Sequence, residues 1–388
     1  MSGRALLLVL DSVGVGAAPD ADQYRDVGAD TLGHLMHLGL RLPTLWSLGL
    51  GQILGRGGVP RPLGRYGRMR PAANGKDSTT GHWELAGAVL SEPFATFTRF
   101  PSELVDAIEE ECGVAFIGNR PASGTGILEE LGPEQLRTGK LILYTSADSV
   151  LQIAAHERVL ALDRLYEVCR VARRHADPWR IGRVIARPFT GRPGSFSRTA
   201  DRHDFSMEPP RNVLDVLTEG GFRVLGVGKV ADLFAQRGFA RSYPTRSNMD
   251  GMRTTAELWD EEIDGLIFTN LVDFDAAYGH RRDAEGYARA LVQFDDWLAG
   301  FLPGCRAPDL VVITADHGND PTFHGTDHTR EEVPVLLLHG GQAGDLGVRS
   351  TLADVGATLA EHFGVEWSGP GRSLLSCATA GTGLGVNI

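Results

Sequence analysis

Short runs of apolar residues recur along the chain and alternate with segments of helical periodicity. Runs of this length predict buried strands of a parallel sheet. They cover residues 4–10, 223–228, 264–272, 309–314 and 333–338. Apolar residues at helical spacing predict helices within residues 285–302 and 351–364. This alternation predicts an α/β fold with a doubly wound, mostly parallel sheet, whose ligands bind beyond the carboxyl ends of the strands.

The middle of the chain has a different pattern. From residue 92 to 210 strand signals are weaker and chain breakers are frequent, as in GNRPASGTG and RPFTGRPGSFSRT. Between Arg158 and Arg211 there are twelve arginines against six acidic residues. We interpret residues 92–210 as an inserted domain with a basic face, between core segments 1–91 and 211–388. The alternative is a set of long surface loops.

Acidic residues follow three of the predicted strands. Asp11 ends the first strand, and Asp275 comes shortly after the strand 264–272. Asp316 and His317 follow the strand 309–314. Because the carboxyl ends of parallel strands meet at one edge of a sheet, these residues are expected to form a single site.

Histidines near these aspartates complete a candidate metal site. The segment TADHGNDPTFHGTDHTRE, residues 314–331, also contains His328, and His280 lies five residues after Asp275. Carboxylates combined with imidazoles suit Mn²⁺ or Zn²⁺. Six candidate ligands are enough for two metal ions about 3.5–4 Å apart. They are Asp11, Asp275, His280, Asp316, His317 and His328. The roles of Asp320 and His324 stay open: His324 either orients a metal ligand or is simply a loop residue, and we favour the loop residue.

A run of three hydroxyl residues stands out in the segment GKDSTTGHWE, residues 75–84. Ser78, Thr79 and Thr80 follow Lys76 and Asp77. A hydroxyl at a helix start beside metal ions can be deprotonated and can attack phosphorus. The alternative is helix capping, a common use of Ser and Thr. Further along the segment, His82 is expected to be structural or to support a ligand, and Trp83 to lie in the core.

Composition narrows the class of partner. The formal net charge is −11, which argues against nucleic acid, whereas a small phosphate ester can be bound through local cations. The four cysteines are scattered without CxxC spacing, so reduced thiols in a cytoplasmic protein are expected. The first apolar run is too short for a signal peptide or a membrane span. We expect a monomer that does not bind membranes.

Motifs spread over most of the chain resemble those of the prokaryotic phosphopentomutase family, which belongs to the alkaline phosphatase superfamily. The segments that carry the resemblance, in family order, are DSVGVGAAPDA, GKDSTTGHWE, GNRPASGTGIL, YTSADSVLQIAAHE, RVIARPF, RNVLDVL, SNMDGM, LVDFDAAYGHRRD and TADHGNDPTFHGTDHTRE. They extend from residue 11 to residue 331. The resemblance implies a core of alkaline phosphatase type and identifies the middle segment with the family's cap domain.

The resemblance also implies roles for the candidate residues. Asp11, Asp316 and His317 would hold one Mn²⁺ with the nucleophile, and the other three candidates would hold the second. The nucleophile would be Ser78, where the family usually has Thr; Thr79 and Thr80 remain alternatives. Other divalent cations are possible. The residues that would meet the sugar phosphate are Ser146, Asp148, Val150, Arg187, Arg198, Arg202 and Lys229.

The activity implied is interconversion of ribose 1-phosphate and ribose 5-phosphate, and of the 2-deoxyribose equivalents. It would proceed through phosphorylated Ser78 and a pentose 1,5-bisphosphate, with a sugar bisphosphate such as glucose 1,6-bisphosphate as activating donor. Two alternatives remain. One is a metal-dependent phosphatase or a mutase for another substrate, such as phosphoglycerate. The other is a metal-stabilised binding protein without catalysis.

Overall fold

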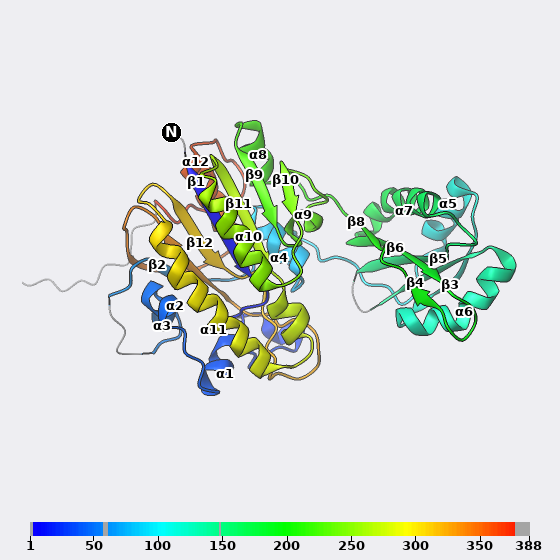
Figure 1. The fold of residues 1–388 in the computed structure, drawn as a ribbon, viewed down its shortest axis with the longest axis horizontal. Coiled ribbons are helices and arrows are strands. Elements are labelled where there is room, and N and C mark those ends of the chain that lie inside the picture. The colour runs from blue at the N-terminus through cyan, green and yellow to red at the C-terminus, as the bar shows by residue number, and fades with distance from the viewer. Residues whose placement is uncertain (1–2, 57–60, 147–148, 377–388) are drawn as a thin grey trace, which may run out of the picture. The chain divides into compact units, whose positions relative to one another are not determined.

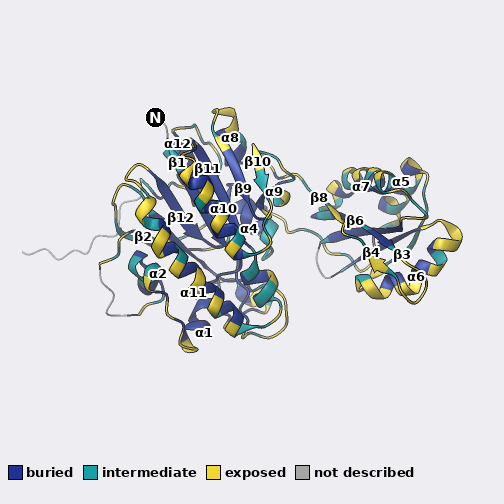
Figure 2. Cartoon of the chain, viewed as in Figure 1, coloured by how far each residue is buried: buried dark blue, intermediate teal, exposed yellow. Residues whose placement is uncertain are grey.

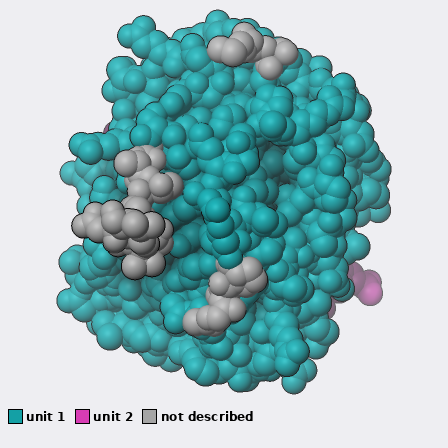
Figure 3. Space-filling model, turned by 90° about the vertical axis from the view of Figure 1, so that its left-hand side faces the viewer, with its two compact units in different colours: residues 1–92, 209–388 teal, residues 93–208 magenta. Residues whose placement is uncertain are grey.

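Two compact units make up the chain. The computed structural model describes residues 3–56, 61–146 and 149–376. Unit 1 consists of residues 1–92 and 209–388, and unit 2 of residues 93–208, as coloured in Figure 3. Each unit contains its own β-sheet. Among the described residues, no helix has both the length and the apolar character needed to cross a lipid bilayer.

Unit 1 is built on an eight-stranded sheet in the order β10-β9-β11-β1-β12-β13-β2-β14. These strands are β1 (Arg4–Leu10), β2 (Arg65–Met69), β9 (Arg223–Val227), β10 (Arg241–Tyr243), β11 (Gly265–Leu271), β12 (Leu310–Thr314), β13 (Val333–Leu338) and β14 (Gly344–Arg349). The first five in the order, β10 to β12, run parallel. All five strands predicted from the apolar runs are present, which confirms the doubly wound, mostly parallel sheet.

The direction predicted for one strand is wrong. β13 is antiparallel to both β12 and β2, although its apolar run indicated another parallel strand. A parallel neighbour of β12 would need a crossover connection, usually a helix, whereas an antiparallel one can be joined by a loop. The connection 315–332 is such a loop, and it begins and ends at the same edge of the sheet. The residues of the histidine-rich segment therefore stay at the carboxyl end of β12.

Helices cover both faces of this sheet, because adjacent residues of β11 contact different helices. Phe268 stacks on His82 of α4 at 5.8 Å between ring centroids. The next residue, Thr269, lies 2.8 Å from Thr255 of α10 between hydroxyl oxygens. Since successive side chains of a strand point to opposite faces, α4 and α10 lie on opposite sides. In Figure 1, α10 and α11 lie in front of the sheet, and Figure 2 shows its central strands fully buried.

The helices of unit 1 vary widely in length. They are α1 (Thr31–His37), α2 (Pro43–Leu48), α3 (Leu50–Ile53), α4 (Ser78–Leu85), α8 (Val213–Glu219), α9 (Val230–Leu233), α10 (Asn248–Asp260), α11 (Ala284–Phe301) and α12 (Asp354–Phe363), with 3-10 turns η1 (Ala21–Tyr24) and η4 (Leu302–Gly304) and the π-helical turn η3 (Phe274–Gly279). The two helices predicted by periodicity correspond to α11 and α12. The second begins three residues later than the start of the predicted segment.

Unit 2 is an α/β layer structure and not a set of long surface loops. Its sheet has the order β3-β4-β5-β6-β7, with β8 also paired to β6. The elements are β3 (Phe116–Pro121), β4 (Leu141–Thr145), β5 (Val150–His156), β6 (Arg183–Thr190), β7 (Ser197–Arg198), β8 (His203–Ser206), α5 (Ser102–Cys112), α6 (Gly124–Thr138), α7 (Leu162–Ala176) and the 3-10 turn η2 (Asp177–Trp179). Leu141 and Leu143 pack with α5 and α7, while Ile142 and Tyr144 pack with α6. Helices thus cover both faces.

Candidate metal and nucleophile site

The carboxyl ends of three neighbouring parallel strands carry the acidic residues of the site. β1 lies between β11 and β12 in the sheet. Asp11 directly follows β1, and Asp316 lies two residues beyond the end of β12. Asp275 lies in η3, the turn that follows β11. Residues about three hundred positions apart in the sequence therefore meet at one edge of the sheet.

Asp11, Asp316 and His317 form the first of two groups of metal-type ligand atoms. One ligand atom from each lies within 4.8 Å of the others. Nε2 of His317 is 3.4 Å from Oδ1 of Asp11 and 3.4 Å from Oδ2 of Asp316. All three residues are buried. The structure thus brings together the three residues assigned to one metal by resemblance.

Asp275, His317 and His328 form the second group, within the same 4.8 Å limit. Nε2 of His328 is 3.5 Å from Oδ1 of Asp275. His280 belongs to neither group, but its Nε2 is 3.1 Å from Oδ2 of Asp275. The six candidate ligands therefore lie next to one another in space. His317 belongs to both groups, and His280 lies beside the second group through its contact with Asp275.

Backbone carbonyls orient two of the imidazole rings. Nδ1 of His317 lies 3.0 Å from the carbonyl oxygen of Gly318, and Nδ1 of His280 lies 2.7 Å from that of Thr326. A proton on Nδ1 that is donated to a carbonyl leaves Nε2 as the lone-pair atom, which is the form that binds metal. Both Nε2 atoms face the carboxylates described above. The rings are thus held ready to act as ligands.

Unpaired polar atoms at the centre of the site fit the binding of divalent cations. Oδ1 of Asp11 and Nε2 of His328 are buried and have no hydrogen-bond partner among the described residues. Buried polar atoms are normally satisfied, so carboxylate and imidazole atoms that converge without a partner fit the binding of a cation. A set of aspartates and histidines suits Mn²⁺ or Zn²⁺ and offers more ligands than one ion needs.

The pKa shifts of the site residues also fit the binding of divalent cations. Burial, together with the charges of Asp316 and Asp275, raises the pKa of Asp11 well above its ordinary value. Burial acts against a charged His317, but Asp316 and Asp11 outweigh it and raise the pKa of His317 to about 9. Burial also acts to raise the pKa of Asp275, yet His328 and His280 hold it well below its ordinary value. The buried aspartates therefore favour positive charge on His317, and a divalent cation can take the place of that proton.

Ser78 begins α4 and faces the first group. Its Oγ lies 3.1 Å from Nε2 of His317. The hydroxyl of Thr80 is already used, because it donates to Oδ2 of Asp77 at 2.6 Å, and the Thr80 N–H donates to Oδ1 of the same carboxylate at 3.0 Å. Asp77 is thus the cap of the helix. Of the hydroxyl run, Ser78 is the residue whose hydroxyl contacts a candidate metal ligand.

Close packing of α4 on the Asp316 segment depends on Gly81. A Cβ atom built at this position would lie 2.2 Å from the backbone carbonyl oxygen of Asp316. Gly81→Ala is therefore expected to destabilise the protein by about 1–3 kcal/mol. Activity should fall as well, because relief of the clash moves Ser78 away from the ligands. Urea denaturation and phosphatase assays would measure both effects.

Gly300→Ala is the matched control for this substitution. Gly300 also lies in a helix, α11, but an added Cβ there meets nothing within 4 Å. This variant is expected to gain roughly 0.4–1 kcal/mol, since alanine restricts the unfolded chain more than glycine does. If both variants behaved alike, tight contact between α4 and the Asp316 segment would be contradicted.

Residues not singled out in the sequence support the ligands. The backbone N–H of Ser12, which has a left-handed φ of 72°, donates to Oδ1 of Asp316 at 3.1 Å. Nδ2 of Asn319 donates to Oδ1 of Asp275 at 2.7 Å, and Nδ2 of Asn270 donates to Oδ2 of Asp11 at 3.1 Å. Ser12 and Asn319 lie within quoted motifs, but their spacing alone gave no signal for these contacts.

The other candidate residues of the two motifs lie outside the ligand groups. Nδ1 of His82 is 2.9 Å from Oδ2 of Asp316, so this buried histidine supports a ligand. Trp83 is fully buried and donates to the carbonyl oxygen of Leu233, as expected of a core residue. Asp320 contacts His34 outside both ligand groups. His324 is exposed, and its ring contacts that of its neighbour Phe323 in a tilted arrangement.

The residues expected to meet the sugar phosphate are spread over both units. In unit 2, Ser146 follows β4, Val150 begins β5 and is buried, and Asp148 lies outside the described residues. Lys229 belongs to unit 1, where it is exposed at the start of α9. None of the described residues of this set belongs to either ligand group.

The three arginines expected to contact substrate lie near one another in unit 2. Burial, followed by the positive charges of Arg202 and Arg198, lowers the pKa of Arg187. Nε of Arg187 donates to Gln152 at 3.1 Å, and Arg202 pairs with Asp204. The pKa of Arg187 is thus lowered first by its own burial and then by its charged neighbours, which places several positive charges close together.

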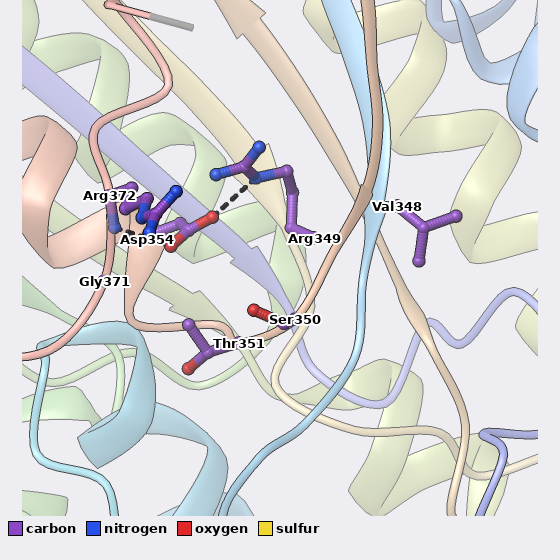
Figure 4. Close-up of a pocket in the computed structure, with 7 residues that line it drawn as sticks. All are labelled: Val348, Arg349, Ser350, Thr351, Asp354, Gly371 and Arg372. Atoms are coloured by element: carbon purple, nitrogen blue, oxygen red, sulfur yellow. Dashed lines mark hydrogen bonds and ion pairs between the residues drawn. The ribbon is translucent and has the colours of Figure 1, made fainter.

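One pocket has none of the candidate ligands in its lining. Figure 4 shows a pocket of about 450 Å³ between the end of β14 and the start of α12. Its Arg349 is neutralised by Asp354 at 2.6 Å, and none of the candidate ligands lines it. The chemistry described above belongs instead to the compact groups of buried ligands.

Comparison with known proteins places the chain in a family. A model of the Metalloenzyme superfamily matches residues 3–367, so the chain belongs to this superfamily. The PH0037 protein from Pyrococcus horikoshii is similar in structure, with a TM-score of 0.51, 14% identity, and coverage of 95% of this chain and 99% of that chain. A phosphoglycerate mutase from Leishmania mexicana, crystallised at low cobalt concentration, has a TM-score of 0.51 and 12% identity, covering 96% and 97%.

At these identities the two structures establish a similar fold, and the family model places the chain in the Metalloenzyme superfamily. Family membership implies a metal-dependent enzyme, and the two groups of buried ligands provide candidate positions for its divalent ions. The protein is therefore a metalloenzyme of this superfamily.

Proposed function

We propose that the protein is a phosphopentomutase that interconverts ribose 1-phosphate and ribose 5-phosphate, and the 2-deoxyribose equivalents. The observation that carries this proposal is the position of Ser78, whose Oγ lies 3.1 Å from Nε2 of His317. A hydroxyl nucleophile beside two groups of buried metal ligands is suited to forming a phosphorylated intermediate. The family resemblance of the surrounding motifs supports the pentose substrate.

Each step of the reaction assigns a task to residues of the chain. Divalent ions such as Mn²⁺, when bound, would polarise the phosphoryl oxygens and lower the pKa of the Ser78 hydroxyl. Ser78 begins α4, so the partial positive charge of the helix start favours an anion there. His82 and Ser12 keep Asp316 in place through the contacts described above. Little more than alignment and charge neutralisation is needed for phosphoryl transfer.

Phosphorylated Ser78 gives its phosphoryl group to the free hydroxyl of ribose 5-phosphate, which forms the 1,5-bisphosphate and regenerates the serine. The phosphate at the other end then returns to Ser78, leaving ribose 1-phosphate. A sugar bisphosphate such as glucose 1,6-bisphosphate would phosphorylate Ser78 initially. Water must be excluded while the phosphoserine exists, because hydrolysis would end the cycle.

A second phosphate group on the bisphosphate requires its own binding residues. We propose that Arg187, Arg198 and Arg202 bind phosphate, since their positive charges lie close enough together to lower the pKa of Arg187. Tyr144 lies beside Arg198 and is 1% exposed. Arginine is suited to this task because its planar fork binds two phosphate oxygens at once.

A product assay tests the proposed function. The protein is activated with glucose 1,6-bisphosphate and incubated with Mn²⁺ and ribose 5-phosphate. Formation of ribose 1-phosphate is expected, with little free phosphate. Release of free phosphate alone would identify a phosphatase, turnover of 3-phosphoglycerate alone would identify a different mutase, and no reaction with any substrate would contradict an enzymatic role. A parallel assay with 2-deoxyribose 5-phosphate would measure sugar preference.

Lys229→Ala is expected to lower mutase activity about tenfold or more while leaving hydrolysis of 4-nitrophenyl phosphate nearly unchanged. The reason is that remote charge binds the non-reacting phosphate of a bisphosphate, and a hydrogen bond to a charged group contributes about 1.5–3 kcal/mol. An aryl phosphate has no second phosphate. Steady-state kinetics of both reactions would measure the difference.

Lys140→Ala provides the control, because Lys140 is an exposed lysine at the end of a surface segment. It should leave both activities unchanged. Equal losses of both reactions in Lys229→Ala, or no loss in either, would exclude Lys229 as a phosphate-binding residue.

A further inference from the structure

Arg330 is buried close to the candidate site but is not among its ligands. Its side chain is one of the largest fully buried side chains, with the residue 2% exposed. Nη2 lies 2.8 Å from Oδ2 of Asp20, and Nε lies 3.1 Å from Oδ1. The guanidinium also lies over the ring of Tyr24, 4.9 Å from its centroid. Burying a charge costs free energy unless the charge is fully paired, so a buried arginine at this position has a structural or functional role.

The rest of the guanidinium binds backbone. Nη1 donates to the carbonyl oxygens of Ala73 at 2.8 Å and Gly75 at 2.5 Å, and Nη2 donates to that of Pro71 at 2.9 Å. The guanidinium of Arg330 thus donates hydrogen bonds to every second backbone carbonyl of residues 71–75. A planar fork of donors can do this, whereas the single ammonium of a lysine cannot reach the same set.

Residues 71–75 lead directly to the nucleophile and form neither helix nor strand. Glu84, fully buried in α4, accepts hydrogen bonds from the N–H groups of Ala72 at 2.9 Å and Ala73 at 2.8 Å. The segment is therefore held by Arg330 through its carbonyls and by Glu84 through its N–H groups. Side chains replace the backbone pairing that a regular element would supply.

The same arginine belongs to the ligand segment. It lies two residues after His328. Its backbone N–H donates to Oδ2 of Asp26 at 2.8 Å, and Nζ of Lys76 lies 3.0 Å from the same oxygen. The chain before Ser78 and the chain after His328 are thus connected twice, once through the guanidinium and once through Asp26.

We propose that Arg330 is a positioning residue, which holds residues 71–75 so that Ser78 stays aligned with the ligand groups. This inference rests on the proposed role of Ser78 as nucleophile. Arg330 touches neither Ser78 nor a ligand side chain, and it acts through the backbone of the segment between them. Displacement of a reacting group by about 1 Å can lower the rate about 100-fold, so loss of the fork should act on turnover.

Arg330→Lys tests the proposal, with hydrolysis of 4-nitrophenyl phosphate in the presence of Mn²⁺ as the assay. The variant is expected to bind metal ions in the same number as the wild type. Its kcat should fall about 100-fold with a KM within about threefold of the wild-type value. A separate variant, Arg330→Ala, should regain part of its kcat when guanidinium chloride is added at low, non-denaturing concentration. A purely structural role would instead lower the amount of folded protein and leave the kcat of the folded fraction unchanged.

Arg65→Lys is the matched control. Arg65 is also a buried arginine that donates to backbone carbonyls, those of Leu374 and Leu375, but these lie far along the chain from the nucleophile segment. The Arg65→Lys substitution is expected to lower the melting temperature of the protein without lowering its kcat. Asp20→Asn, which weakens the carboxylate side of the Arg330 network, should lower kcat in the same direction as Arg330→Lys but by less.

Three results would overturn the proposal. They are a kcat within about twofold of wild type in folded Arg330→Lys, an equal kcat loss in Arg65→Lys, and a loss of metal in proportion to activity. Failure of the pentose assignment is distinguishable, because a wild type that hydrolyses the aryl phosphate but forms no ribose 1-phosphate overturns the proposed substrate alone. A wild type that neither hydrolyses the aryl phosphate nor becomes phosphorylated on Ser78 overturns both proposals.

Discussion

Ser78→Ala is expected to abolish phosphoryl transfer, with a loss of mutase activity of about 10⁴-fold or more, as is found when a catalytic nucleophile is removed. Ser78 begins α4 and its hydroxyl lies 3.1 Å from Nε2 of His317, so the substitution removes the proposed acceptor of the phosphoryl group. After exposure of the wild type to glucose 1,6-bisphosphate, mass spectrometry should locate a phosphate on Ser78. The alanine variant should remain unmodified.

Two control variants distinguish the chemistry of Ser78 from that of its neighbours. Ser78→Thr restores the residue usual in the phosphopentomutase family and should keep substantial activity. Thr79→Val removes a neighbouring hydroxyl while keeping the side-chain shape and should be close to wild type. The assignment would be wrong if Ser78→Ala stayed active with its phosphate on Thr79 or Thr80. Phosphorylation of Thr80 would also break the hydrogen bond through which it contacts Asp77.

Asp316→Ala should abolish activity and lower metal content by about one ion per chain. Asp316 belongs to the first ligand group and is buried beside Asp11 and His317. Its loss should lower affinity for Mn²⁺ by more than the 10–100-fold typical of residues that only support a ligand. Mass-spectrometric metal analysis of the purified protein, together with Mn²⁺ titration, would measure the change.

Asp296→Asn is the control for removal of a carboxylate. Asp296 is exposed on α11, in the same unit as the ligands. It should bind the same number of ions as the wild type and keep its activity. Full metal content in a folded Asp316→Ala protein would count against the assignment of Asp316 as a ligand. Circular dichroism establishes that the variant is folded before metal is measured.

The sequence alone predicted the class of fold and the edge of the sheet where polar residues gather. Continuous apolar runs indicate strands buried on both faces, and such strands occur in parallel sheets covered by helices. Asp11 and Asp316 follow such runs within two residues, so a parallel sheet places them together whatever the details of packing. The structure brings them, Asp275 and the associated histidines into contact.

The pattern of apolar residues was less informative for strands that are polar or antiparallel. β3 is only partly buried and includes Gly118, Asn119 and Arg120, so it lacks the apolar run that marks a buried strand. The apolar run of β13 is as strong as that of a parallel strand, and its antiparallel direction depends on the loop that joins it to β12. Residue periodicity indicates burial but not strand direction.

Tertiary structure alone decided which polar residues support the site. The carbonyls of residues 71–75 bind Arg330, more than 250 positions away along the chain, and the carboxylate of Asp316 binds the N–H of Ser12 at a separation of 304. Hydrogen bonds of this kind are short-ranged and directional, so they exist only once the strands have brought distant segments within about 3 Å. Side-chain type and spacing therefore determined the candidate ligands of this protein, whereas the contacts that hold ligands and nucleophile in place were determined by the folded chain.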